Sequence, residues 1–212
     1  MNRKIILFGA TGNTGLEICK ELESKNINYS AFVRKGSESK LKIYSSDIIT
    51  GDVLEIAAVE KAINKDDFTD VIIALGSRKF RGGEIRFNGT KNIIDSLNSN
   101  KKQAKIHVIS ANGIGNSWKN LKWHEKLMCK LLISKAMNDH ELQEELVSSN
   151  TGGYHIVRPV GLTNELGSGK INVEEELALP NSKVSRANVA KYLVDSMCDN
   201  TSGRHSLCDA DV

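Results

Sequence analysis

Short runs of apolar residues alternate along the chain with longer stretches in which apolar residues recur every three or four positions. The runs lack apolar–polar alternation and predict strands at 4–8, 31–33, 43–49, 71–75, 106–109 and 154–157, with a late one near 205–208. The longer stretches predict helices at 14–26, 54–63, 85–98, 123–133 and 186–197. Strands that are buried on both faces and separated by helices form a mostly parallel sheet between two helical layers. The pattern predicts a single doubly wound α/β domain over residues 1–212.

The pattern becomes less regular after Pro159, until the last predicted helix. No repeat, low-complexity tract or Ser/Pro-rich linker divides the chain, so we expect no second domain. We expect the segments at about 111–140 and 159–185 to fold over the carboxyl edge of the sheet. Open α/β sheets bind their ligands at that edge, so these segments form the predicted substrate side.

The composition excludes several classes of protein. The 212 residues include 29 Lys and Arg against 26 Asp and Glu, and a formal charge of +3 gives no reason to expect a nucleic-acid or membrane partner. The apolar run before the first glycine is too short for a secretory signal or a spanning helix. The four cysteines form no C-x-x-C pair, and His205 with Cys208 offers two ligands where zinc needs more. We therefore expect a cytoplasmic protein with reduced thiols and no metal.

A glycine-rich loop between the first strand and the first helix carries the strongest functional signal. It reads Gly9-Ala10-Thr11-Gly12-Asn13-Thr14-Gly15. In a dinucleotide-binding turn the first glycine permits a tight bend, the second lets the backbone approach the pyrophosphate, and the third lets the helix pack on the strand. Gly9, Gly12 and Gly15 have that order, and the side chains of Thr11, Asn13 and Thr14 can add donors. The N–H groups at the start of the helix attract the anion.

The end of the second predicted strand indicates which dinucleotide binds. Cofactors without a 2′-phosphate usually meet an Asp or Glu there, about 20 residues past the glycines. This chain has Arg34 and Lys35 instead. A guanidinium binds a phosphate with two parallel hydrogen bonds, so this pair favours NADP(H) over NAD(H). The alternative is a solvated pair of cations at a strand end.

Two further strand ends lie at suitable distances along the chain. Asp52 and Val53 follow the third strand, where Asp52 can accept from the adenine amino group and Val53 can bound the ring. Asp52 can instead be the N-cap of the next helix. Leu75 and Gly76 close the fourth strand beside the expected pyrophosphate and nicotinamide ribose, and Arg78 is positioned to reach a phosphate or an acidic substrate. Arg78 also belongs to a short basic run, which is the alternative interpretation.

These residues resemble the opening of the atypical short-chain dehydrogenase/reductases, an NAD(P)-binding Rossmann group that includes the NmrA-like proteins. Within that group the resemblance is strongest to the NADPH-dependent biliverdin-IXβ and flavin reductases, and it runs from residue 1 to about 165. The matching segments are 5–15, 32–34, 51–54, 75–78, 88–94, 110–111 and 138–140.

The resemblance implies a single-domain reductase that passes hydride from NADPH to a flavin or a linear tetrapyrrole in an open pocket above the nicotinamide. It places Ser110 beside the nicotinamide and His140 near the substrate edge. It places Arg158 and Pro159 along the other side of the cofactor. The family carries a second histidine after its proline pair, whereas this chain has Val160. Any role of that second histidine is therefore absent here.

The catalytic tyrosine of the short-chain dehydrogenases, with lysine four residues later, is missing, because no tyrosine in the chain has a lysine at that spacing. An alcohol–ketone reaction needs such an acid, whereas a conjugated acceptor spreads the incoming charge over its ring. Orientation of the two partners can then supply most of the rate. The sequence therefore favours a planar conjugated acceptor.

Two residues are candidates for the chemistry. His140 can donate a proton because its ordinary pKa lies near neutrality, although it can equally be an ordinary residue of a first helical turn. Ser110 ends a buried strand at the carboxyl edge, where its hydroxyl can bond the nicotinamide or the substrate; the alternative is a simple strand-end turn. Trp118 and Trp123 can form an aromatic wall for a planar acceptor or can pack in the core.

Two other functions remain open at this point. A regulator that senses NADP(H) and binds a protein partner without turnover shares the glycine loop, and the missing tyrosine suits it. A nucleotide-sugar epimerase-like enzyme is disfavoured by the short C-terminal portion and by the missing tyrosine. We expect a monomer or a weak homodimer.

Overall fold

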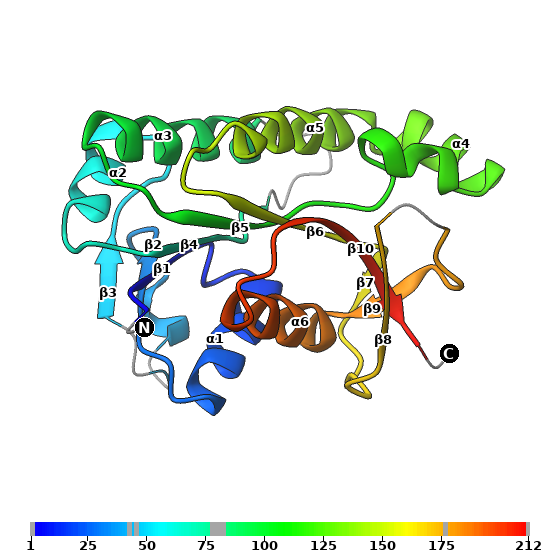
Figure 1. Ribbon diagram of the computed structural model, residues 1–212, viewed down its shortest axis with the longest axis horizontal. Helices are drawn as coiled ribbons and strands as arrows, with labels where there is room; N and C mark the ends of the chain where they lie inside the picture. The colour runs from blue at the N-terminus through cyan, green and yellow to red at the C-terminus, as the bar shows by residue number, and fades with distance from the viewer. Residues whose placement is uncertain (1–2, 42–43, 45–46, 77–83, 176–177, 211–212) are drawn as a thin grey trace.

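The computed structural model describes residues 3–41, 44, 47–76, 84–175 and 178–210, which form a sheet between two layers of helices (Figure 1). The strands are β1 (Ile5–Phe8), β2 (Tyr29–Val33), β3 (Asp47–Thr50), β4 (Asp70–Ile73), β5 (Lys105–Ile109), β6 (Tyr154–Pro159), β7 (Gly161–Thr163), β8 (Ile171–Glu174), β9 (Lys183–Ser185) and β10 (Gly203–Asp209). In the described ranges the main sheet has the order β3-β2-β1-β4-β5-β6-β10-β8, and β7 pairs with β9. Its neighbours are parallel except β10 and β8. The predicted doubly wound, mostly parallel fold is confirmed.

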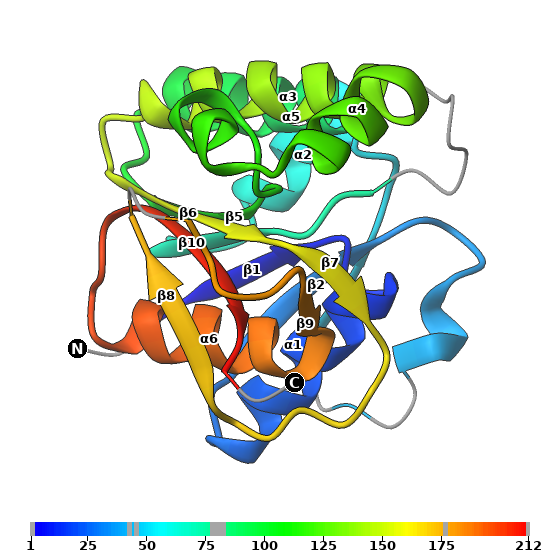
Figure 2. The same ribbon diagram turned by 90° about the vertical axis from the view of Figure 1, so that its right-hand side faces the viewer.

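The helices lie on both faces of the sheet (Figures 1 and 2). They are α1 (Asn13–Ser24), α2 (Ile56–Ile63), α3 (Ile85–Ser99), α4 (Trp123–Leu132), α5 (Ser134–Ser148) and α6 (Arg186–Cys198), with short 3₁₀ turns at Glu38–Leu41 and Gly115–Asn120. Figure 2 shows α1 and α6 beneath the sheet and α2, α3 and α5 above it. Helix α4 continues the upper layer beyond the start of α5. None of the described helices is both long and apolar enough to cross a membrane.

Successive residues of each central strand enter two different hydrophobic cores. Ile5 and Leu7 of β1 pack in the core between the sheet and helices α1 and α6. Ile6 and Phe8 pack in the core between the sheet and helices α2 and α3. All four are almost fully buried. The near-continuous apolar runs in the sequence therefore correspond to strands that helices cover on both faces of the sheet.

The predicted elements agree closely with the structure wherever a core determines them. The helix predicted at 85–98 is Ile85–Ser99, and the one predicted at 123–133 is Trp123–Leu132. Within the described residues, the strand predicted at 43–49 is Asp47–Thr50, which lies at the sheet edge with three of its four residues exposed. Residues 43, 45 and 46 lie outside the described part of the chain. The helix predicted to open near His140 begins earlier, at Ser134, so His140 lies in its middle and the first-turn interpretation is wrong.

The segment after Pro159 contains three strands that the pattern did not indicate. Strand β8 pairs antiparallel with β10 and extends the main sheet, while β7 and β9 form a small parallel pair. Each has only three or four residues, most of them partly exposed. Their pairing with distant strands stabilises them, and local apolar periodicity does not report such pairing.

Candidate functional site

The loop between β1 and α1 has a shape that only glycine permits at two positions. Gly9 has φ of +86°, and a Cβ there would collide with the carbonyl oxygen of Ala74 at the end of the neighbouring strand. A Cβ at Gly15 would collide with the carbonyl oxygen of Gly9, so the helix packs directly on the loop. Gly12 is exposed, and its missing side chain leaves the backbone open to another molecule.

The start of α1 offers N–H groups to an anion. Gly12 is the N-cap and has no side chain that could accept from the first turn. The first intrahelical bond runs from the Leu16 N–H to the Gly12 carbonyl at 2.8 Å, so the N–H groups before it lack an intrahelical acceptor. The first turn contains no acidic residue. The loop therefore fits the diphosphate of a dinucleotide, and Thr11, Asn13 and Thr14 remain predicted donors at its rim.

The ends of β2 and β3 lie side by side, and they bring the other predicted cofactor residues together. The Gly51 N–H donates to the Val33 carbonyl at 2.9 Å, so Arg34 and Asp52 follow directly after neighbouring strand ends. Arg34 and Lys35 are exposed. Within the described part of the chain, neither side chain makes a hydrogen bond or an ion pair. These two cations are therefore available to a ligand phosphate.

Asp52 is held by its own turn. One of its carboxylate oxygens accepts from the Leu54 N–H at 3.0 Å, while the N-cap of α2 is Glu55. The alternative that Asp52 caps this helix is therefore wrong. The carboxylate still has free acceptor capacity for an amino group. Val53 is buried, and the Asn92 side chain donates to its carbonyl at 2.9 Å.

Leu75 and Gly76 follow β4 at the same edge of the sheet. A Cβ on Gly89 would lie 2.8 Å from the Leu75 Cδ1 atom and 3.1 Å from Val53, so α3 packs closely on this strand end. A Cβ added to Gly76 would lie 3.9 Å from the Arg86 Nη2 atom, so the Arg86 guanidinium is close to this strand end. Arg78 lies outside the described residues, and its predicted role stays a prediction.

Ser110 belongs to a hydrogen-bonded group that we call the Ser110 network, in which Ser110, Glu144 and Arg158 are buried and Asn116 is exposed. The Ser110 hydroxyl donates to Glu144 Oε1 at 2.5 Å. Arg158 Nε donates to the same oxygen at 3.0 Å, and its Nη2 donates to Glu144 Oε2 at 2.6 Å. Arg158 Nη1 donates to the Asn116 side-chain oxygen at 2.6 Å. Ser110, Glu144 and Arg158 are each less than 5% exposed, so a paired charge lies directly behind the Ser110 hydroxyl.

Arg158 was predicted to lie along the cofactor, but its side chain is buried against Glu144 and Asn116. Its guanidinium is committed to Glu144 and Asn116, and the side chain is only 2% exposed, so the structure does not present it to a cofactor. Pro159 ends β6 in the sheet interior, and its carbonyl accepts from the Asn112 N–H at 2.9 Å. Both residues support the strand end that holds the Ser110 network.

His140 is buried in α5, close to the start of α3. The neighbouring Asp139 accepts from the Phe87 N–H at 2.9 Å and from the Arg86 guanidinium at 3.2 Å, which fastens the two helices together. Burial, followed by the nearby Arg86 charge, lowers the pKa of His140 to about 3. The imidazole is therefore neutral at pH 7, and the structure does not provide the expected imidazolium as a proton donor.

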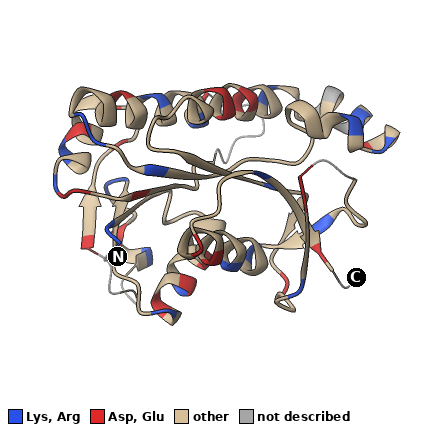
Figure 3. Ribbon diagram, in the orientation of Figure 1, with Lys and Arg blue, Asp and Glu red and all other residues tan. Residues whose placement is uncertain are grey.

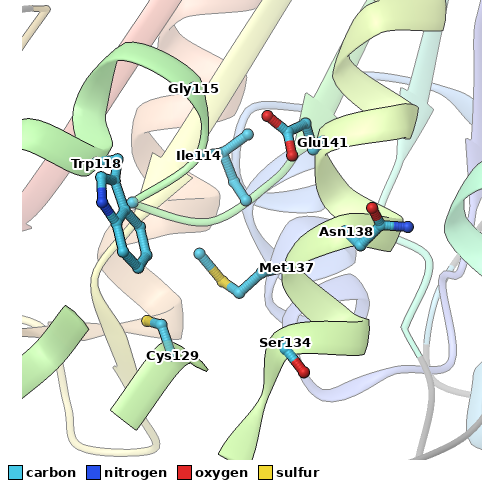
Figure 4. Close-up of a pocket in the computed structure, with 9 residues that line it drawn as sticks. Ile114, Gly115, Trp118, Cys129, Ser134, Met137, Asn138 and Glu141 are labelled. Carbon is cyan, nitrogen blue, oxygen red and sulfur yellow. The ribbon is translucent and has the colours of Figure 1, made fainter. Parts of the chain in front are cut away.

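A pocket of about 420 Å³ lies between the turn after β5 and the first half of α5 (Figure 4). Its described lining is mostly apolar or neutral: Gly113, Ile114, Gly115, Trp118, Cys129, Ser134, Met137, Asn138 and Glu141. In Figure 4 the side chains of Trp118, Ile114 and Met137 surround its centre. All nine belong to the predicted segment at about 111–140 or its next turn, and none belongs to 159–185. Trp118 lies in the pocket, whereas Trp123 is 77% exposed on α4.

Glu144, Asn116 and Arg86 belong to the site but were not predicted from the sequence. Glu144 follows His140 by four positions in one helix, and that spacing places both residues on one face. This is the one signal that could have identified Glu144. Its partner Arg158 lies on a strand, and only the folded topology brings the two together.

Comparison with known proteins agrees with this geometry. Residues 9–200 match a family described as NAD(P)H-binding. A chloroplastic protein of Arabidopsis thaliana is 29% identical to this chain over an alignment of 212 positions, which covers 94% of this chain and 74% of that protein.

Two solved structures share the fold over nearly the whole chain. The anaerobilin reductase ChuY of Escherichia coli O157:H7 has a TM-score of 0.83 at 20% identity, covering 99% of this chain and 98% of that one. A short-chain dehydrogenase/reductase of Veillonella parvula in complex with NADP has a TM-score of 0.80 at 15% identity, covering 100% and 96%. The family match extends from the glycine loop to the end of α6, and the chain belongs to the NAD(P)H-binding family of Rossmann-fold proteins.

Proposed function

We propose that this protein is an NADPH-dependent reductase that transfers hydride to a planar conjugated acceptor, either a flavin or a tetrapyrrole-like molecule. One observation carries the proposal: the glycine loop, the cations after β2 and the pocket behind the turn after β5 all lie beyond the carboxyl ends of the parallel strands. Open α/β sheets bind dinucleotides at this edge. The reductase-like fold of the neighbours supports the reaction class.

The chain can hold NADPH with residues that are already in place. The first-turn N–H groups of α1 would bind the diphosphate, and Arg34 with Lys35 would bind the 2′-phosphate. Asp52 and Val53 would flank the adenine, and Leu75 and Gly76 would adjoin the ribose. Bound NADPH supplies the hydride. Ser110 would orient the nicotinamide, because its proton is engaged by Glu144 and its lone pairs remain free to accept.

The described residues of the site offer no strong proton donor, and this favours a conjugated hydride acceptor over a ketone. His140 is neutral at pH 7, and the chain has no tyrosine with lysine four positions later. Reduction of a conjugated ring tolerates this, because its charge is delocalised and water can supply the proton. Alignment of the two rings then provides most of the acceleration.

Aerobic NADPH oxidation with added FMN tests the activity directly. Turnover that depends on both FMN and the protein supports the reductase. Tight NADPH binding in calorimetry without turnover on any conjugated acceptor would instead identify a cofactor sensor. Calorimetry without heat for either coenzyme would refute both.

The choice of NADP(H) is tested by Arg34→Glu. Loss of a charge-assisted bond to the 2′-phosphate should weaken NADPH binding by about 10- to 100-fold. NADH lacks that phosphate, so its dissociation constant should change little. Titration calorimetry with both coenzymes measures the two constants.

Lys61→Glu is the matched control, because it makes the same charge change on the exposed surface of α2. It should leave both constants unchanged. Equal losses of NADPH and NADH binding in Arg34→Glu would contradict the assignment of NADP(H).

A further inference from the structure

The pocket in Figure 4 has a single charged side chain among its described lining residues, the carboxylate of Glu141. Met137, Ile114 and Trp118 present apolar surface, while Ser134 and Asn138 are neutral. Burial raises the pKa of the Cys129 thiol, so that group also stays neutral. No lysine or arginine is part of the described lining. Figure 3 shows acidic residues gathered in the middle of α5, the helix that carries Glu141.

The pocket is joined to the Ser110 network. Glu141 precedes Glu144 by three positions in α5, so the two carboxylates lie on the same side of the helix, one turn apart. The opposite wall is fixed by the Ser117 hydroxyl, which accepts from the Gly113 N–H at 2.9 Å. Asn116, in the same turn, binds Arg158. The turn that forms one wall of the pocket therefore also carries a member of the Ser110 network, and the helix that forms the other wall carries both Glu141 and Glu144.

The charges of these two carboxylates are not equivalent. Glu144 is buried and paired with Arg158, whereas Glu141 is exposed and has no ion pair in the described part of the chain. An unpaired carboxylate at the wall of a small apolar pocket repels a second anion and tolerates a neutral ring. The volume of about 420 Å³ is near the small end of the range for ligand pockets.

We propose that the acceptor enters this pocket as an uncharged ring, of the naphthoquinone or isoalloxazine class, and that Glu141 excludes rings that carry a carboxylate or a sulfonate. The inference rests on the proposed reductase function and narrows its substrate class. It disfavours a tetrapyrrole with two propionates. For a quinone, hydride from NADPH and a proton from water give the hydroquinone and NADP⁺, so two electrons and two protons are accounted for.

The experiment compares menadione with naphthoquinone sulfonate, which share a bicyclic quinone ring and differ mainly in charge. Steady-state NADPH oxidation gives kcat/KM for each quinone in the wild type and in Glu141→Lys. The sulfonate also changes the reactivity of the ring, but that effect cancels in the ratio between the two proteins. We expect Glu141→Lys to shift the preference toward the sulfonate by about tenfold or more, since one unit charge is reversed close to the ring.

Glu145→Lys is the matched control. It makes the same charge change on the same helix, and Glu145 is exposed but does not line the pocket. In Glu145→Lys, the ratio of kcat/KM for the two quinones should stay within about twofold of the wild-type ratio. Glu141→Gln should fall between the wild type and Glu141→Lys. Equal shifts in Glu141→Lys and Glu145→Lys, or no shift in either, would overturn the inference.

A binding measurement separates this inference from the proposed function. The chain has two tryptophans, so Trp123→Phe leaves Trp118 as the only indole reporter, and a quinone in the pocket should quench it. Menadione should quench at lower concentration than the sulfonate, and adding Glu141→Lys should reduce or reverse that order. This pattern without NADPH oxidation would support the pocket and refute the reductase. Oxidation with equal quenching by both quinones would support the reductase and refute the inference.

Discussion

Two buried polar groups lie on opposite faces of the sheet, and they handle charge in opposite ways. On the α5 face, the Ser110 network contains a carboxylate and a guanidinium in direct contact. The pair is buried, but its charges compensate each other, and Asn116 and Ser110 each add a further hydrogen bond to it. Removing one partner of such a pair lowers stability strongly, whereas replacing both partners by well-packed apolar residues changes the free energy of unfolding little.

On the α6 face, three histidines form what we call the histidine row: His107 on β5, His155 on β6 and His205 on β10. His155 Nε2 lies 3.2 Å from His205 Nδ1, and the rings of His107 and His155 meet edge to face with centroids 5.8 Å apart. His107 also contacts Asp70 at 3.0 Å. Burial, followed by the neighbouring histidines, lowers the pKa of His155 to about 3, so the imidazole at the centre of this row stays neutral where the other group is ionised.

The positions along the strands explain the difference. Ser110 and Arg158 lie at the carboxyl ends of β5 and β6, where a ligand arrives and a fixed field is useful. His155 and His205 lie near the amino ends of β6 and β10, away from the glycine loop. We infer that the charged group serves the site and that the neutral one serves the core. The first should be sensitive to loss of a partner, and the second to acid.

The largest expected effect comes from Glu144→Ala. It leaves the Arg158 guanidinium buried without its counter-charge, and removing one partner of a buried pair costs about 3–5 kcal/mol of unfolding free energy. Urea unfolding followed by circular dichroism measures the loss.

The double variant Glu144→Leu with Arg158→Met removes both charges and serves as the control. It should lose less stability than Glu144→Ala alone, because no fully buried charge is left uncompensated; Arg204, whose Nε lies 3.7 Å from Glu144 Oε2, is partly exposed to water. A loss below about 1 kcal/mol in Glu144→Ala would show that the pair is hydrated in solution, and the contrast between the two faces would fail.

The next effect is the acid sensitivity of the histidine row. Well above pH 6.5, His155 is neutral in both the folded and the unfolded chain, so it contributes almost nothing to the pH dependence of stability there. Below that pH the unfolded chain takes up a proton that the folded chain, with a pKa of about 3, does not accept. Stability therefore falls with decreasing pH, by about 2 kcal/mol for this residue between pH 7 and pH 5.

Urea midpoints measured from pH 7.5 to pH 5 test this expectation. His155→Phe should reduce the loss at pH 5 by about the amount that one histidine contributes. His124→Gln is the control, because His124 is exposed and should leave the pH dependence unchanged. A pH profile of His155→Phe identical to that of the wild type would show that the row is protonated in the folded protein.

Ser110→Ala should have a moderate effect, and on turnover more than on stability. The substitution removes the hydroxyl that we propose orients the nicotinamide, so kcat for NADPH oxidation should fall by about tenfold, a change of about 1.4 kcal/mol. Glu144 keeps its bonds to Arg158, so the unfolding free energy should change by about 1 kcal/mol or less.

Ser96→Ala matches this change at a buried serine on α3, whose hydroxyl donates to the Asn92 carbonyl at 2.7 Å. It should cost similar stability and leave kcat unchanged. Equal turnover in Ser110→Ala and the wild type would show that the Ser110 network does not contribute to NADPH oxidation.

The same contrast shows how far the sequence could predict this protein. Local patterns were sufficient where one element determines its own environment. The apolar spacing of Ile93, Ile94 and Leu97 predicted α3, and the order of glycines predicted a loop in which Gly9 and Gly15 have no room for a side chain. They were not sufficient for β7, β8 and β9, whose short half-exposed runs are stabilised by distant partners.

The candidate site divides in the same way. The exposed cations Arg34 and Lys35 could be interpreted from their place after a strand. Arg158 could not, because its partner Glu144 is on another element, and the sequence does not show that β6 passes beneath that turn of α5. The pKa of His140 depends on burial and on Arg86, more than 50 positions away, so its neutrality also required the structure.

The smallest expected effect is Tyr192→Phe, which probes the outer end of the histidine row. The Tyr192 hydroxyl lies 2.7 Å from His205 Nδ1, and its removal should cost about 1 kcal/mol of unfolding free energy, the usual net value of one such bond. The rate of NADPH oxidation should stay the same, because α6 lies across the sheet from the pocket. Urea unfolding and steady-state kinetics on the same preparation measure both quantities. A loss of turnover without a loss of stability would mean that the row communicates with the site, and the division between a functional face and a structural face would be wrong.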